Sequence, residues 1–175
     1  MVRTRAFQAR NRGSIPRRVI RTDMKKISAG ILVYRKNKEE KIEVLLAHNG
    51  GPYFQNKDAG FWNIPKGLID ENEDLLEAAK REFKEETGFD IGGNLIPLGE
   101  IERKDGKTIH AWAVENSIDT SKAKSNTVKI EWPPKTGKVL EFPEIDKIEY
   151  FPIEAAREKI HHESEIFIDR LLEKI

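Results

Sequence analysis

The sequence predicts one α/β domain, built from apolar strand segments and amphipathic helices. Three observations support this fold class. Short apolar runs end at charged turns or at Gly and Pro, as strands do. Two segments, 73–87 and 153–175, repeat apolar residues at helical spacing. The 175 residues are enough for one domain with its own hydrophobic core.

Six segments are predicted as strands: 27–34, 42–48, 61–67, 95–103, 108–115 and 145–151. A charged turn separates the first two, which indicates a hairpin. The third is short because Pro65 and Gly67 interrupt it. The Asp105-Gly106 turn joins the fourth and fifth. The polar stretch 116–143 is predicted as a long loop with at most one short strand.

The clearest helix is 73–87. Asn72 is the expected N-cap, and Gly88 suits the residue after the last turn. Leu75, Leu76, Ala79 and Phe83 recur at helical spacing and predict the buried face. The C-terminal segment 153–175 is also predicted as helical, with a break at His161-His162.

Composition limits the classes of function. Hydrophobic residues make up 38% of the chain and charged residues 35%, which is typical of a globular protein. No apolar run approaches the roughly 20 residues that span a bilayer, so no membrane partner is expected. Cysteine is absent, which excludes thiolate chemistry and disulfides. The N-terminus lacks a secretory pattern, and we expect a cytoplasmic location.

Residues 1–25 are predicted to form a basic, extended arm before a folded domain at 26–175. Nine Lys or Arg residues and one Asp give residues 1–26 a charge of +8, so the whole chain's +1 leaves −7 for residues 27–175. No sustained apolar period occurs in the arm. Three interpretations stay open: a stretch upstream of a start at Met24, a solvated tail, or an arm that binds RNA or a partner.

Three glutamates stand on one face of the first predicted helix. Glu82, Glu85 and Glu86 are spaced i, i+3 and i+4, which brings their side chains within reach of one another. They occupy the C-terminal turn, where the helix dipole already disfavours negative charge. A hard divalent cation such as Mg²⁺ would relieve both effects. The alternative is a solvated acidic face moderated by Lys80 and Lys84.

The residues around these glutamates complete a longer pattern. In order they are Gly67, Glu73, Arg81-Glu82, the aromatic Phe83, Glu85-Glu86, Gly88 and the apolar Phe89. This stretch resembles the complete box of the Nudix hydrolase superfamily, whose members use Mg²⁺ to split phosphoanhydride bonds in nucleoside-diphosphate-type substrates. The resemblance implies a Nudix fold, a mixed β-sheet in an α/β/α sandwich.

The resemblance also implies a metal site. Glu85 and Glu86 would bind Mg²⁺, for which Mn²⁺ can substitute, and Glu82 would be a further ligand or would activate water. The backbone carbonyl of Gly67 would join the metal shell. Metal ions of this kind neutralise charge that develops on phosphate oxygens and lower the pKa of a bound water.

The resemblance also implies an ion pair beside the site and a further carboxylate in it. Arg81 would pair with Glu73 and hold the preceding loop against the helix, so its contribution to catalysis would be indirect. Many members add a late carboxylate from a loop that faces the metal site. Glu144 is our first choice for that role, Glu141 and Glu131 are the alternatives, and all three could be ordinary loop acids.

Four residues before the box are candidates for substrate binding. Lys57 and Lys66 flank the approach to the site and would meet phosphate oxygens as point charges, unless they are ordinary surface lysines. Tyr53 and Trp62 are candidates for stacking on a base. The alternative for Trp62 is that it forms part of the core.

Segments 57–67, 131–137 and 142–146 are similar to the MutT-like NTP pyrophosphohydrolase branch and to the dinucleoside polyphosphate hydrolase branch. The expected activity is therefore Mg²⁺-dependent hydrolysis of an NTP or a dinucleoside polyphosphate. The basic arm motivates one alternative, an RNA 5′-end pyrophosphohydrolase. A nucleotide-binding module without catalysis is the other. Nudix domains often dimerise, so a homodimer also stays open.

Overall fold

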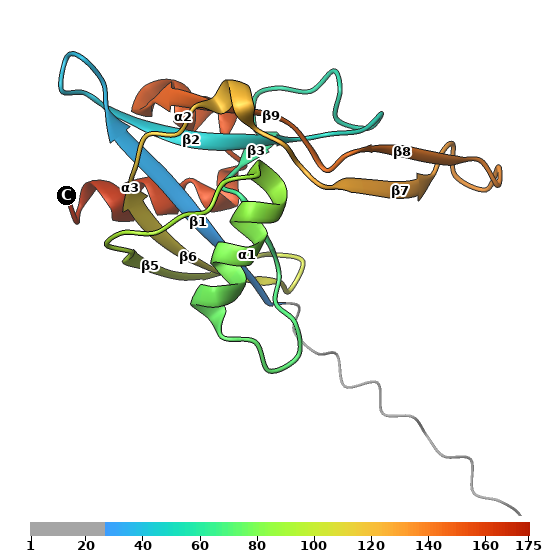
Figure 1. Ribbon diagram of the computed structural model, residues 1–175, viewed down its shortest axis with the longest axis horizontal. Coiled ribbons are helices and arrows are strands. Elements are labelled where there is room, and N and C mark those ends of the chain that lie inside the picture. The colour runs from blue at the N-terminus through green and yellow to red at the C-terminus, as the bar shows by residue number, and fades with distance from the viewer. Residues whose placement is uncertain (1–26) are drawn as a thin grey trace, which may run out of the picture.

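A seven-stranded mixed sheet forms the centre of the molecule, and helices lie on both of its faces (Figure 1). This computed structural model describes residues 27–175. The strands of the sheet are β1 (Ile27–Lys36), β2 (Ile42–Asn49), β3 (Trp62–Asn63), β4 (Lys66–Leu68), β5 (Ile96–Glu102), β6 (Thr108–Glu115) and β9 (Ile145–Pro152). The helices are α1 (Leu75–Thr87), α2 (Ile153–Lys159) and α3 (Ile166–Leu172), with short 3₁₀ turns η1 (Thr120–Lys122) and η2 (His162–Ser164).

Strand β1 is the central element of this sheet. It pairs antiparallel with β2 and parallel with β6, and the strand order is β3-β2-β1-β6-β5. Side chains alternate along a strand, so each face of β1 enters a different core. Ala29, Ile31 and Val33 pack with α1, whereas Leu32 and Tyr34 pack with α2 and α3. The predicted α/β/α sandwich with a mixed sheet is therefore confirmed.

Strand β4 pairs with the first part of β1 and brings the start of the box next to the sheet. This approach is close because Gly30 has no side chain. A Cβ at Gly30 would lie 2.5 Å from Cβ of Lys66 and 2.6 Å from the carbonyl oxygen of Pro65. Gly30 thus allows β4 to lie beside α1, where the functional site forms.

The C-terminal segment folds as two helices with a turn between them. Helix α2 ends at Lys159, η2 covers His162–Ser164, and α3 begins at Ile166. The predicted break at His161-His162 is confirmed. None of the helices within residues 27–175 is long and apolar enough to cross a membrane. The predicted arm at 1–25 lies outside the described residues.

The predicted start of the first helix is wrong by two residues. Helix α1 begins at Leu75, and Asp74 is its N-cap, with a side chain that accepts hydrogen bonds from the backbone N–H groups of Leu76 and Glu77. Asn72 lies earlier in the loop with a φ of 63°. Both Asn and Asp suit an N-cap, so residue type alone does not distinguish Asn72 from Asp74.

The prediction of a long loop at 116–143 is also wrong. Strands β7 (Thr127–Glu131) and β8 (Val139–Pro143) form an antiparallel hairpin that projects from the body of the molecule (Figure 1). Val128 pairs with Phe142 and Ile130 with Leu140, so these apolar side chains share one face of the hairpin. A period of two over so few residues is easily hidden among polar neighbours.

Candidate active site

A cavity of about 660 Å³ lies beside the C-terminal half of α1. Its walls come from the loop after β2, from β4, α1, the β5–β6 turn and the β7–β8 hairpin. The acidic residues that line the cavity are Glu82, Glu85, Glu86 and Glu144, and the basic ones are Lys66, Arg103 and Lys107. Its aromatic and aliphatic lining includes Tyr53, Phe54, Val128, Ile130 and Phe142. Acidic, basic and apolar surfaces therefore meet in one space.

Glu82 lies directly against β4, in room that exists because residue 67 is glycine. A Cβ on Gly67 would lie 1.9 Å from Oε2 of Glu82. The carboxylate accepts a hydrogen bond from Nη1 of Arg81 at 2.7 Å. Burial raises the pKa of Glu82, and the neighbouring Arg81 only partly offsets this effect. The position of Glu82 is thus set by the backbone of β4 and by Arg81.

Glu86 is the most buried of the three helix glutamates, with 6% of its surface exposed. Its Oε2 accepts a hydrogen bond from the backbone N–H of Lys66 at 2.8 Å. Burial raises the pKa of Glu86 to about 8, and the charge of Lys66 counteracts this only in part. Glu85 is more open to solvent and lies 3.4 Å from Nη1 of Arg81.

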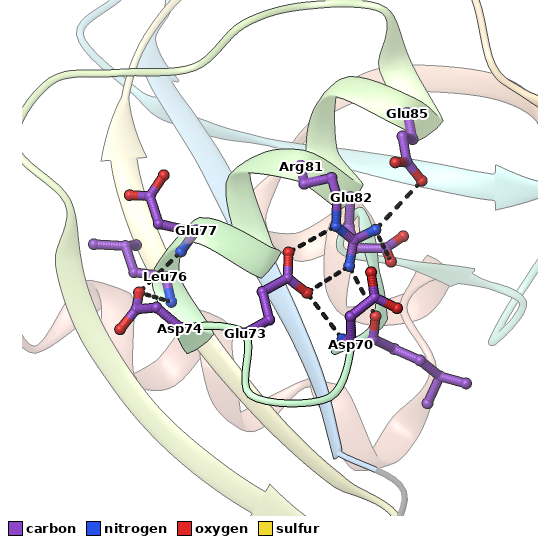
Figure 2. A network of polar contacts seen from close by, with 9 residues as sticks. Asp70, Glu73, Asp74, Leu76, Glu77, Arg81, Glu82 and Glu85 are labelled. Carbon is purple, nitrogen blue, oxygen red and sulfur yellow. Dashed lines mark hydrogen bonds and ion pairs between the residues drawn. The ribbon is translucent and has the colours of Figure 1, made fainter.

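Arg81 joins the loop before α1 to the helix itself (Figure 2). Its Nε and Nη2 each donate to Glu73 at 2.8 Å, and Nη2 also donates to the carbonyl of Leu68 at 3.1 Å. The hydrogen bonds from Arg81 and from the backbone N–H of Asp70 lower the pKa of Glu73 to about 2. The predicted Arg81–Glu73 pair is present, and it fixes the loop between β4 and α1.

The chemistry of this donor set fits a hard divalent cation. Glu82 and Glu86 are carboxylates in a protected site whose burial disfavours their negative charge, and Gly67 leaves the room that a carboxylate and a ligand need. Within residues 27–175, no group of three or more His, Cys, Asp or Glu is arranged to hold a metal ion. In this geometry Glu82 accepts a hydrogen bond from Arg81, and Glu86 accepts one from the backbone N–H of Lys66.

Of the three late carboxylates, only Glu144 reaches this space. Glu144 lines the cavity, and its negative charge contributes to the raised pKa values of Glu82 and Glu86. Glu141 instead accepts a hydrogen bond from Thr127 on the neighbouring strand, and Glu131 accepts one from the backbone of the hairpin tip. The geometry therefore favours Glu144 over the two alternatives.

Two of the four candidate substrate residues line the cavity, and the other two, Lys57 and Trp62, are not among its lining residues. Lys66 and Tyr53 line the cavity. Lys57 is turned onto the ring of Tyr53, with Nζ 3.3 Å from the ring centroid. Trp62 is 4% exposed, packs in the core on the α2 and α3 side, and donates its indole N–H to Asp58. The ring of Trp62 cannot stack on a base in this geometry, because core side chains cover it.

Two basic residues of the cavity are absent from the sequence-based prediction. Arg103 and Lys107 stand at the two ends of the β5–β6 turn, where the backbone N–H of Arg103 donates to the carbonyl of Lys107 at 2.8 Å. The Asp105-Gly106 signal predicts that turn correctly. It does not indicate which end of the sheet the turn occupies, so the sequence does not predict that Arg103 and Lys107 share a cavity with the carboxylates.

Known proteins are similar to parts of this sequence. Nudix hydrolase 10 of Arabidopsis thaliana is 40% identical over 65 residues, which are 37% of this chain and 20% of that protein. The asymmetrical bis(5′-nucleosyl)-tetraphosphatase of Rattus norvegicus is 28% identical over 100 residues, 50% of this chain and 63% of that protein. The chain thus matches only about a fifth of the first relative's length.

A solved structure of an Ap4A hydrolase binary complex from C. elegans has the same fold, with a TM-score of 0.56 at 24% identity. The likeness covers 85% of this chain and 96% of that one. A family profile described as the NUDIX domain matches residues 24–171, nearly the whole chain. With its box folded around Arg81 and its carboxylates gathered against Gly67, the chain belongs to the NUDIX domain family.

Proposed function

We propose that this chain is a metal-dependent hydrolase that splits a phosphoanhydride bond in a nucleoside-diphosphate-linked substrate. The observation that carries the proposal is the cluster of Glu82, Glu85 and Glu86, gathered at one end of a cavity that also holds Arg103 and Lys107. Carboxylates that would bind a metal ion and basic side chains in the same cavity suit a polyphosphate chain.

Glu82, Glu85 and Glu86, with the backbone carbonyl of Gly67, would hold Mg²⁺, with Mn²⁺ as a substitute. When bound, such a cation neutralises phosphate oxygens and lowers the pKa of a coordinated water. Glu144 faces the same space and would orient the attacking water or accept its proton at a carboxylate oxygen. The protein otherwise contributes position and charge, as is general for phosphoryl transfer.

The most suitable substrates are an NTP or a dinucleoside polyphosphate. Tyr53 and Phe54 on one loop and Ile130 and Phe142 on the hairpin give the cavity an apolar surface for a nucleoside. The tetraphosphatase activity named for the rat relative supports a substrate with several phosphates. Lys66 lines the same cavity, next to Glu86, and would contact phosphate oxygens.

The two alternatives have less support in the described residues. RNA 5′-end hydrolysis depends on the basic segment 1–25, while residues 27–175 carry −7 and would repel an RNA backbone. A binding module without catalysis has no need for the buried Glu86, since a carboxylate with a raised pKa is unfavourable unless a cation joins it.

The substrate class is tested by product analysis. The purified chain is incubated with Mg²⁺ and NTPs, dinucleoside polyphosphates, ADP-ribose or 5′-triphosphorylated RNA, and the products are separated by chromatography. We expect nucleoside mono- or diphosphates from the NTPs or the dinucleoside polyphosphates. Tight nucleotide binding by isothermal titration without any product would overturn the hydrolase proposal and favour a binding module.

A further inference from the structure

We propose that Glu163 is a positioning residue that orients the guanidinium of Arg103 toward the phosphate chain, and that this pair favours ligands with three or more phosphates. The inference rests on the proposed function, because it assumes that phosphates occupy the cavity. Its experiment, however, includes a binding measurement that does not depend on turnover.

Glu163 reaches the β5–β6 turn from the far end of the chain. Its Oε2 accepts a hydrogen bond from Nε of Arg103 at 2.8 Å, and its Oε1 accepts one from the backbone N–H of Lys104 at 3.0 Å. One carboxylate therefore fixes both the side chain and the adjacent backbone of this turn. Both side chains are largely enclosed, with 15% of Glu163 and 22% of Arg103 exposed.

The charges of this pair suit a fixed orientation. The backbone N–H of Lys104 and the guanidinium of Arg103 lower the pKa of Glu163 to about 2, so its carboxylate is ionised at neutral pH. Because a guanidinium is planar, holding Nε fixes the direction of the other two nitrogens. Nη2 lies 3.9 Å from Asp105, and Nη1 has no hydrogen-bond partner among residues 27–175.

The turn that carries Glu163 is also tied to β3 by backbone hydrogen bonds. The backbone N–H of His161 donates to the carbonyl of Trp62 at 2.8 Å, and that of Ser164 donates to the carbonyl of His161 at 2.8 Å. Trp62 begins β3, a few residues before Lys66 and Gly67. The C-terminal segment thus links the β5–β6 turn to β3, which shortly precedes β4 and the residues that contact the glutamates.

The expected preference for longer phosphate chains follows from the separate elements that supply the cations and the glutamates. Arg103 and Lys107 enter the cavity from the β5–β6 turn, whereas the helix glutamates enter from α1. A ligand held at both places needs a longer phosphate chain than one held only at the glutamates. Loss of the Glu163 contact should therefore weaken long phosphate chains more than short ones.

The test compares Glu163→Gln, Arg103→Gln and the double variant with the wild type. Glu165→Gln is the matched control, because Glu165 is in the same segment and pairs with Arg157 at 2.9 Å, away from the cavity. Isothermal titration with inorganic tripolyphosphate and with pyrophosphate measures binding directly. Steady-state kinetics with diadenosine tetraphosphate separate KM from kcat.

We expect Glu163→Gln to weaken tripolyphosphate binding about tenfold and pyrophosphate binding much less. KM for diadenosine tetraphosphate should rise by a similar factor at nearly constant kcat. The double variant should bind like Arg103→Gln alone, because one residue acts through the other. Glu165→Gln should match the wild type in all three measurements.

Additive losses in the double variant, or unchanged tripolyphosphate binding in Glu163→Gln, would overturn the inference. A fall in melting temperature without a change in binding would also overturn it, and would identify Glu163 as a structural link only. If the wild type turns over no substrate, the proposed hydrolase function fails, while the tripolyphosphate titrations still decide the role of Glu163.

Discussion

Replacing Gly67 by alanine should remove most of the activity and leave the fold in place. The added Cβ would lie 1.9 Å from Oε2 and 2.1 Å from the carboxyl carbon of Glu82, whereas such contacts are essentially never under 3.0 Å. The Glu82 carboxylate must therefore move by about 1 Å or more. A displacement of that size at a catalytic group can cost about 100-fold in rate, or about 2.7 kcal/mol in activation free energy.

The effect on stability should be much smaller. The group that must move is the end of a flexible side chain, and the backbone at Gly67 is not in the left-handed region. The main loss is the hydrogen bond between Glu82 and Arg81, for which about 1–2 kcal/mol is a reasonable magnitude. A folded protein with a slightly lower melting temperature is therefore expected.

The assay is kcat/KM with saturating Mg²⁺, combined with thermal melts followed by circular dichroism. Gly92→Ala is the matched control, since a Cβ at Gly92 would meet nothing within 4 Å. The control should keep wild-type kcat/KM. If Gly67→Ala also stays within about threefold of wild type, Glu82 does not need its observed position, and this reasoning about the site is refuted.

Three further predictions follow from the site. Arg81→Gln should lower the melting temperature by several degrees because it breaks the double hydrogen bond to Glu73. Lys80→Gln is the control, because within residues 27–175 Lys80 makes only one ion pair, with Glu77 of the same helix, and it should change the melting temperature little. Equal melting temperatures for the two variants would contradict this reasoning. Phe142→Ala should raise KM for a nucleotide about tenfold and leave the binding of inorganic tripolyphosphate unchanged. Equal weakening of nucleotide and tripolyphosphate binding would argue against a contact between Phe142 and the nucleoside. Burial raises the pKa of Glu86 from 4.5 to about 8, so between these pH values the folded state keeps a proton that the unfolded state releases. Thermal melts in EDTA should therefore show stability falling as the pH rises through that range. Glu86→Gln should weaken this pH dependence, and the same pH dependence in the variant would contradict the role of Glu86.

The parts of the site that lie close together in the sequence could be predicted from it. Helical spacing alone places Glu82, Glu85 and Glu86 on one face, and the box indicates that Arg81 turns back to Glu73. These relations depend on one helix and the loop before it. Local geometry of this kind follows from periodicity and residue type.

The parts that depend on long-range pairing could not be predicted. Arg103 and Lys107 reach the cavity only because β6 pairs parallel with β1, which brings the β5–β6 turn to the same end as β4. Trp62 is an aromatic residue next to the box, but its burial is decided by α2 and α3, which are distant in the sequence. The hairpin that carries Phe142 pairs two five-residue strands whose few apolar residues stand among charged and polar ones, so the pattern alone does not reveal it.

The most direct test of the central claim is the Mg²⁺ dependence of hydrolysis in the wild type and in a Glu85→Gln/Glu86→Gln double variant, measured on the best substrate of the panel. Glutamine has the shape of glutamate without its charge, so the variant should fold, and thermal melts check this. We expect a wild-type rate that rises with Mg²⁺ and vanishes in EDTA, and a variant at least about 1000-fold slower at every concentration. A folded variant with the wild-type rate and Mg²⁺ response would contradict the assignment of this carboxylate cluster as the catalytic metal site.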